Sequence, residues 1–285
     1  MTLDIEQSSC IRCGRCVKVC PDRIFVLSDT KGKVKIVHPE ECIYCGHCVS
    51  VCPTDSVKHS EFPPEKVHPI DYHSIPTPDQ VMLLLKARRS NRTITHKPVP
   101  VEMLDAIVEA AHTAPTATNS QNLSYTLVTD PDKLRQVSEY TIRVFDGLLK
   151  KLENPILRPL LKKLLADVYK SIPALRNLKI EHEAGKDPIL RHATALLFIH
   201  TPGSSRFGCE DANLSYQNAS IMAQALGVSQ IYMGFVLAAI KQDRKKQLAG
   251  ILGIEGKIHA IMALGMPAFL YPNYPDRKEV KIRKL

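Results

Sequence analysis

The pattern of apolar and polar residues predicts short strands near the start of the chain and amphipathic helices farther on. The stretches 23–29 and 33–39 flank "TKGK", which predicts a hairpin around Gly32. Helices are expected at 79–90, 100–113 and 210–228, and a strand at 123–130. The letters "TPDQ" at 77–80 predict a capping box, with Thr77 as N-cap, Pro78 at the first helical position and Gln80 reaching back.

The segment 147–179 is basic and rich in leucine. Five of its apolar residues fall on one helical face, namely Leu160, Leu161, Leu164, Leu165 and Val168. A face of this kind normally packs against its own protein, so we expect a lid or an interface element. A helix lying on an anionic membrane surface is the alternative.

Length and composition indicate a globular protein with one large and one small domain. The chain has 285 residues, of which 44% are hydrophobic. Its longest uninterrupted apolar runs, 193–199 and 261–266, are far shorter than the roughly 20 residues of a membrane helix. The start, "MTLDIEQSS", lacks the features of a secretory signal. We therefore expect no membrane span and a cytoplasmic location, where thiols serve as metal ligands more often than as disulfides.

A repeat contains eight of the nine cysteines. "CIRCGRCVKVCP" at 10–21 and "CIYCGHCVSVCP" at 42–53 are identical at nine of twelve positions when Cys10 is aligned with Cys42. Each copy reads C-x2-C-x2-C-x3-C-P, the spacing of bacterial proteins that hold two [4Fe-4S] clusters, in which the fourth cysteine ligates the other cluster. This spacing assigns one cluster to Cys10, Cys13, Cys16 and Cys52, and a second to Cys42, Cys45, Cys48 and Cys20.

Zinc and disulfides explain this spacing less well. A zinc ribbon uses two C-x2-C pairs and leaves the other cysteines of each copy without a role. Disulfides are disfavoured by the expected compartment. The segment 1–60 therefore resembles the two-cluster bacterial ferredoxins. The segment 61–78, which contains five prolines, is expected to form a semi-rigid linker.

Charge is distributed unevenly between the two parts of the chain. Residues 1–60 contain eight Lys/Arg and seven Asp/Glu, whereas the remainder contains 30 and 22 and so carries most of the formal +9. Bound clusters would make the first part negative, which favours its docking on the positive remainder. We expect no nucleic-acid binding, because no recognition motif accompanies the positive charge.

Two further stretches carry binding chemistry. "ARRSNR" at 87–92 places Arg88, Arg89, Ser90 and Arg92 at a helix end, a set suited to a phosphate, although arginines are also common there because they complement the helix dipole. The small-residue loop "APTATNSQN" at 114–122 ends in side-chain amides that can contact a flat heterocycle.

Together these stretches resemble the FMN-dependent nitroreductase family, from about residue 80 to the end. The segments "EDANLSYQNASIMAQALGV", "SQIYMGF" and "GMPAFLYPNYPDRKEV" also match that family. The resemblance implies FMN bound by Arg88, Arg89, Ser90, Arg92, Pro115, Thr116, Asn119, Gln121, Met233, Gly234, Arg277 and Lys278. The family's usual aromatic after "R-x-R" and its proline and tryptophan after the amide loop are missing here, which leaves the substrate open.

The resemblance also implies the architecture and partners. We expect an α+β fold with a ferredoxin domain at 1–60, a linker at 61–78, and an FMN domain at 79–285 whose mainly antiparallel sheet is flanked by helices. The resemblance implies a homodimer with flavins at its interface. NAD(P)H can act as the donor in this family, and a redox protein such as a ferredoxin or flavodoxin suits the clusters.

The two halves suggest one hypothesis for function. Two [4Fe-4S] clusters would relay electrons to FMN, which would reduce a small electrophile such as a nitroaromatic, a quinone or an activated alkene. The alternatives are a flavin reductase or oxidase, and a non-enzymatic module that passes electrons to a partner protein. No side chain is predicted as catalytic, because the flavin carries the chemistry.

Overall fold

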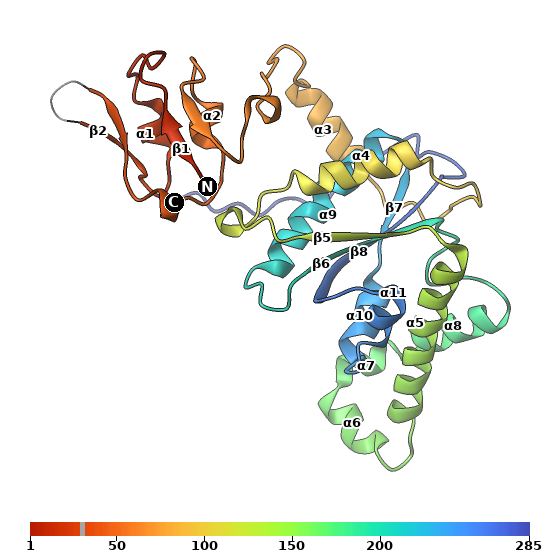
Figure 1. Cartoon of the computed structure of the whole chain (residues 1–285). Coiled ribbons are helices and arrows are strands. Elements are labelled where there is room, and N and C mark those ends of the chain that lie inside the picture. Colours follow the sequence, from red (N-terminus) through yellow and green to blue (C-terminus); the bar gives the residue numbers. More distant parts are fainter. Residues whose placement is uncertain (29–31) are drawn as a thin grey trace. The chain divides into compact units, whose positions relative to one another are not determined.

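The computed structural model describes residues 1–28 and 32–285 and divides the chain into two compact units (Figure 1). The first unit consists of Met1–Pro76 together with the short segment Thr116–Gln121. The second consists of Thr77–Pro115 and Asn122–Leu285. The amide loop therefore packs with the cysteine-rich unit, although both of its neighbours in the chain belong to the second unit.

Two short antiparallel pairs and two short helices build the first unit. Strand β1 (Leu3–Ile5) pairs with β4 (Val57–His59), and β2 (Phe25–Leu27) pairs with β3 (Val34–Ile36). Helix α1 spans Arg15–Val19 and α2 spans His47–Ser50, with 3-10 turns at Pro39–Glu41 and Pro64–Lys66. The β2–β3 pairing confirms the predicted hairpin, and Thr30 and Lys31 of its expected turn lie outside the described residues.

The sequence repeat is also a repeat of the backbone. Helices α1 and α2 begin at equivalent positions of the two copies, as do strands β2 and β4. Three pairs of equivalent residues share a positive φ: Arg12 and Tyr44 (57° and 55°), Gly14 and Gly46 (69° and 71°), and Arg23 and Asp55 (55° and 50°). Glycine adopts this conformation without steric cost, which explains its place just before each helix.

A small apolar core joins the two repeats. Its buried residues include Ile24, Phe25, Val34 and Val57, together with the thiols of Cys16 and Cys48. Burying a side chain such as Phe25 contributes about 1.5–3 kcal/mol. Partly buried side chains of the proline-rich segment, Phe62 and Val67, pack on the same core.

The second unit is built on a four-stranded antiparallel sheet. Its order is β5 (Ser124–Val128), β6 (Ala195–Thr201), β8 (Lys257–Gly265) and β7 (Ser229–Tyr232). Every residue of β6 is buried, as expected for a central strand covered on both faces.

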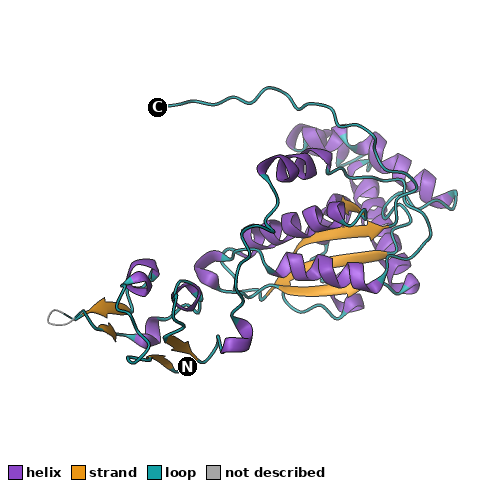
Figure 2. Ribbon diagram, turned by 90° about the horizontal axis from the view of Figure 1, so that it is seen from above, coloured by secondary structure: helices purple, strands orange, loops and turns teal. Residues whose placement is uncertain are grey.

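Helices cover both faces of this sheet (Figure 2). Leu197 and Ile199 face α4 (Val101–His112) and α9 (Gly208–Ala225). The alternate residues Leu196 and Phe198 belong to the core of the opposite face, with α5 (Pro131–Leu152), α8 (Ile172–Glu183), α10 (Gly234–Gln242) and α11 (Gln247–Leu252). The predicted α+β fold, a mainly antiparallel sheet flanked by helices, is confirmed.

Helix α3 (Pro78–Ala87) begins with the predicted capping box. The backbone N–H of Gln80 donates to Thr77 Oγ1 at 3.3 Å, and the N–H of Thr77 donates to Gln80 Oε1 at 2.9 Å. The helix buries none of its residues, and Val81, Met82, Leu83 and Leu85 are exposed.

The expected single helical face within 147–179 is wrong. The chain forms α6 (Arg158–Leu164) and α7 (Ala166–Lys170), which are separated by a break at Leu165. Leu161 and Val168 pack against the core, whereas Leu160 and Leu164 are exposed. Among the described residues, no helix has the length and apolar character needed to cross a membrane.

Candidate functional site

The cysteines of the two motifs lie in two groups, and each group mixes the motifs. Burial raises the pKa of Cys16, and the nearby thiols of Cys10 and Cys52 raise it further. Burial also raises the pKa of Cys42, as do the thiols of Cys45 and Cys20. Cys52 thus lies with the first motif and Cys20 with the second, which is the exchange that the spacing predicts.

The surroundings of these thiols suit iron–sulfur clusters. One cavity is lined by Cys10, Cys13, Cys16 and Cys52, the four residues predicted for the first cluster. Burial raises the pKa of Cys48 to about 11, so without iron that thiol holds its proton, which metal binding would displace. Within the described part of the chain, no three His, Cys, Asp or Glu side chains are grouped as ligands of a single metal ion.

Backbone amides donate to a sulfur atom in each group. The N–H of Ile24 lies 3.4 Å from Cys20 Sγ, and the N–H of Ser56 lies 3.3 Å from Cys52 Sγ. These donors occupy equivalent positions of the two copies, like the cysteines that they contact. Donors of this kind stabilise the negative charge of a ligating thiolate.

His59, which was not predicted as a site residue from the sequence, contacts a predicted ligand. Its Nε2 lies 3.6 Å from Cys42 Sγ, and the side chain is only 5% exposed. Burial lowers its pKa, so the imidazole is neutral at pH 7. The repeat contained the signal, because Leu27 holds the corresponding position of the first copy.

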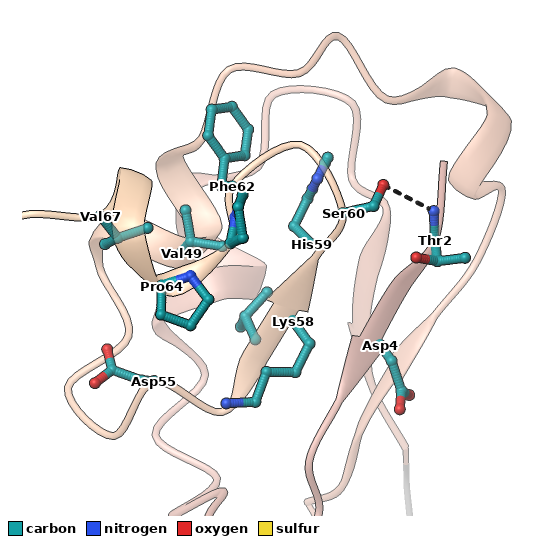
Figure 3. Close-up of a pocket in the computed structure, with 12 residues that line it drawn as sticks. Thr2, Asp4, Val49, Asp55, Lys58, His59, Ser60, Phe62, Pro64 and Val67 are labelled. Carbon is teal, nitrogen blue, oxygen red and sulfur yellow. Dashed lines mark hydrogen bonds between the residues drawn. The ribbon is translucent and has the colours of Figure 1, made fainter.

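His59 also borders a pocket of about 510 Å³ in the first unit. In Figure 3 the rings of His59 and Phe62 lie on one side of this pocket, and Asp55 and Lys58 lie on the other. The pocket is lined by none of the cysteines and by none of the residues predicted to bind FMN.

The predicted arginines at the end of α3 have different local roles. Arg88 is the C-cap of the helix. Arg89 turns back, and its Nη1 donates to the carbonyls of Lys86 at 2.7 Å and Arg88 at 2.9 Å. In this chain its guanidinium therefore completes a helix end, which is the structural alternative to phosphate binding for an arginine at this position. Ser90 is half-buried and Arg92 is exposed.

Two pockets of the second unit bring predicted FMN residues together. Arg92, Met233 and Gly234 line one of about 340 Å³. Arg89 and Arg277 line another of about 300 Å³, where the ammonium of Lys86 lies 5.6 Å from the ring centre of Tyr274. Among the remaining predicted residues of this unit, Pro115 precedes the amide loop and Lys278 is exposed near the C-terminus; neither lines either pocket.

The amide loop has an unusual backbone. Thr118, Asn119 and Gln121 all have positive φ, at 52°, 52° and 46°. Such angles are costly for residues other than glycine, and most costly for a β-branched residue such as Thr118. The loop is held internally by Thr116, whose Oγ1 accepts the N–H of Gln121 at 3.0 Å.

Asn119 ties this loop to the second cysteine motif. Its Nδ2 donates to the carbonyl of Ile43 at 3.0 Å and to that of Tyr44 at 2.8 Å. Both acceptors lie between Cys42 and Cys45. A residue predicted at the flavin thus contacts the backbone that holds two predicted cluster ligands.

Comparisons with known proteins identify both parts of the chain. The nitroreductase family matches residues 85–266, and a 4Fe-4S dicluster domain matches residues 9–56. Rat iodotyrosine deiodinase 1 is 41% identical over 59 residues, which is 20% of this chain and 21% of that protein. The FMN reductase [NAD(P)H] of Bacillus subtilis is 26% identical over 161 residues, which is 55% of each chain. The chain thus spans about a fifth to a half of the length of these relatives.

Solved structures share the fold of the second unit. A nitroreductase from Bacteroides fragilis with bound FMN is 20% identical, with a TM-score of 0.55 over 72% of this chain and 99% of that one. An iodotyrosine deiodinase bound to FMN and 3-iodo-L-tyrosine is 18% identical, with a TM-score of 0.51 over 71% and 97%.

Proposed function

The chain belongs to the nitroreductase family and carries a 4Fe-4S dicluster domain, and we propose that it is an oxidoreductase in which two clusters supply electrons to FMN. The FMN would deliver an electron pair to a small electrophile. The eight motif cysteines would hold the clusters in the two mixed groups described above. The cytoplasm, where thiols stay reduced, suits this arrangement.

One observation carries the proposal. Asn119 belongs to the loop predicted to contact the flavin, and its amide donates to the carbonyls of Ile43 and Tyr44 in the second cysteine motif. A loop with these contacts would hold the polar edge of a flavin and a cluster-binding backbone at the same time.

The residues predicted to bind FMN include cations that suit its phosphate. Arg88, Arg92 and Arg277 offer charge and paired donors for the phosphate. The buried side chain of Gln230 donates to the carbonyl of Arg89 at 3.3 Å and accepts from Tyr216 at 2.8 Å, which fixes the backbone before Ser90. This support would hold the phosphate-binding segment in place.

We propose that the protein is a homodimer. Helix α3 exposes Val81, Met82, Leu83 and Leu85, an apolar surface that a second copy would cover. The C-terminal segment exposes Leu270, Val280 and Ile282 in the same way. Since the predicted FMN residues of the second unit line two separate pockets, residues from a second chain would complete each flavin site.

The acceptor is proposed as a small electrophile: a nitroaromatic, a quinone or an activated alkene. The similarity to iodotyrosine deiodinases adds a halogenated phenol to this set, because removal of the halogen is also a reduction. A flavin reductase, with NAD(P)H as donor, is the second candidate, and the similarity to FMN reductase favours it.

An anaerobic acceptor panel tests the proposal. The reconstituted protein should contain about eight iron and eight sulfide per chain. It is then reduced with dithionite and mixed in a stopped-flow instrument with a nitroaromatic, a quinone, an enone, an iodophenol or free FMN. Rapid reoxidation by one of the first four supports the proposed enzyme, and reoxidation by free FMN alone supports the reductase. If only a partner protein reoxidises the flavin, the enzyme proposal is wrong.

A further inference from the structure

The two copies of the motif differ at a position whose side chain, in the second copy, contacts a predicted ligand. Strand β4 is the counterpart of β2 in the second copy, so His59 corresponds to Leu27. His59 is 5% exposed and lies 3.6 Å from Cys42 Sγ. Leu27 is 49% exposed and has no polar hydrogen to donate. The repeat therefore gives the second group a histidine donor where the first copy has an aliphatic side chain.

The tautomer of His59 follows from its second contact. The backbone N–H of Glu61 donates to His59 Nδ1 at 3.1 Å, so that nitrogen has no proton. In a neutral imidazole the proton then lies on Nε2, which faces Cys42 Sγ. His59 is thus the donor and the sulfur is the acceptor.

Packing keeps the imidazole in this position. The ring of Phe62 lies 5.0 Å from that of His59, and the ring of Tyr44 lies 6.0 Å away in an edge-on arrangement. Tyr44 itself belongs to the loop between Cys42 and Cys45. These two neighbouring rings restrict rotation of the imidazole, so the donor is pre-organised.

We propose that His59 raises the reduction potential of the second cluster site by donating Nε2–H to the Cys42 thiolate. Adding an electron makes the site more negative, and a donor to its sulfur stabilises that charge. No proton moves and no bond breaks in this reduction. The inference rests on the proposed clusters but does not require that FMN receive their electrons.

A side chain of the second copy contacts the first group instead. The hydroxyl of Thr54 lies 3.8 Å from Cys52 Sγ, so Thr54 serves as the comparison residue for that group.

The second cysteine group is the one that the amide loop contacts. Asn119 of the amide loop donates to the carbonyls of Ile43 and Tyr44, which belong to the motif of Cys42. His59 therefore tunes the group whose backbone the predicted flavin loop contacts.

A redox titration of the full chain tests this inference. Wild type, His59→Leu, His59→Phe, His59→Gln and Thr54→Val are reconstituted and titrated with mediators and dithionite, with cluster reduction followed by electron paramagnetic resonance. His59→Leu copies the first repeat, and His59→Phe keeps a ring in the slot. His59→Gln keeps an N–H donor, and Thr54→Val probes the other group.

We expect two midpoint potentials. His59→Leu and His59→Phe should make reduction at one of them about threefold to tenfold less favourable, where tenfold is about 59 mV for one electron. His59→Gln should restore most of the loss, and Thr54→Val should leave that potential unchanged. The inference is overturned if the His59 variants that retain their iron keep both potentials. It is equally overturned if His59→Gln matches His59→Leu.

These outcomes are separate from those of the proposed function. If the His59 variants shift a potential but the clusters do not reduce the flavin, the inference holds and the proposed relay is wrong. If the potentials stay unchanged but the clusters do reduce the flavin, the relay holds and the inference is wrong.

Discussion

The side-chain amide of Asn119 donates to the carbonyl oxygen of Tyr44 at a distance of 2.8 Å, across 75 positions of the chain. The same nitrogen donates to the carbonyl of Ile43 at 3.0 Å. Both hydrogens of the amide are used, which fixes the loop that carries Asn119 against the second cysteine motif. The contact also orients the remaining atoms of a loop that the family resemblance assigns to the flavin.

Replacement of Asn119 should slow electron transfer to the flavin. Asn119→Gly keeps the positive φ of 52° but removes both hydrogen bonds. We expect flavin reduction by a one-electron protein donor to slow by at least about tenfold, because misplacement of a redox group is costly. Asn119→Ala should show the same loss and also lower stability by about 1 kcal/mol, since alanine is strained at this φ. Unchanged flavin reduction in Asn119→Gly would show that the contact is only structural.

Gly14 and Gly46 form a matched pair for testing the repeat. Both have a positive φ, so alanine at either position should cost about 1 kcal/mol. A Cβ at Gly46 would lie 3.3 Å from the ring of Phe62, whereas one at Gly14 would lie 3.8 Å from Leu27. We therefore expect Gly46→Ala to lose its cluster absorbance at a lower temperature than Gly14→Ala. Equal losses would mean that Phe62 yields without cost.

The ion pairs of Asp146 should make the stability of the second unit depend on pH. Hydrogen bonds from Lys150 and then Lys179 lower the pKa of this carboxyl, with contacts of 2.8 Å and 2.6 Å. A lowered pKa stabilises the fold above the usual carboxyl pKa, near about 4, and the effect is lost as pH falls through the folded value. Asp146→Asn should therefore melt slightly below wild type at pH 7. The difference should shrink in acid, and a constant difference across this range would contradict the assignment.

The exposed apolar side chains of α3 should control the oligomeric state. Leu83 is 56% exposed, so Leu83→Lys is harmless to an isolated chain but would place a charge in the proposed interface. We expect sedimentation velocity to show that Leu83→Lys is a monomer. We also expect the absorbance of bound FMN to be lower than in wild type. Ile180→Lys on α8, at a residue 61% exposed, is the control and should remain a dimer. Dimers from both variants would remove α3 from the interface.

Local features of the fold could be predicted from the sequence. The exchange of Cys20 and Cys52 between the two groups is predicted by the motif spacing, because the fourth cysteine of each copy follows a short helix that carries it away from the other three. The capping box at Thr77 is likewise local, since Gln80 lies one helical turn away. The difference at His59 could also have been predicted, because the repeat aligns this histidine with Leu27.

Features that depend on distant contacts could not be predicted. The break at Leu165 separates leucines whose spacing fits one continuous helix, and packing of Leu161 and Val168 on the core accompanies it. The attachment of Asn119 to Tyr44 requires three residues with positive φ in one loop, a conformation that these residue types rarely adopt. The resemblance implies that Arg89 binds FMN, yet its guanidinium donates to the carbonyls of its own helix end.

The most direct test of the proposed relay is anaerobic stopped-flow reduction by a reduced ferredoxin, with cluster and flavin absorbance followed separately. Cys20→Ser and Cys52→Ser alter one predicted ligand in each group, and Cys209→Ser, an exposed cysteine outside both motifs, is the matched control. The proposed relay predicts that flavin bleaching follows cluster bleaching in wild type and in Cys209→Ser, and that it slows strongly in the other two variants. Flavin bleaching at the wild-type rate in Cys20→Ser and Cys52→Ser would contradict it.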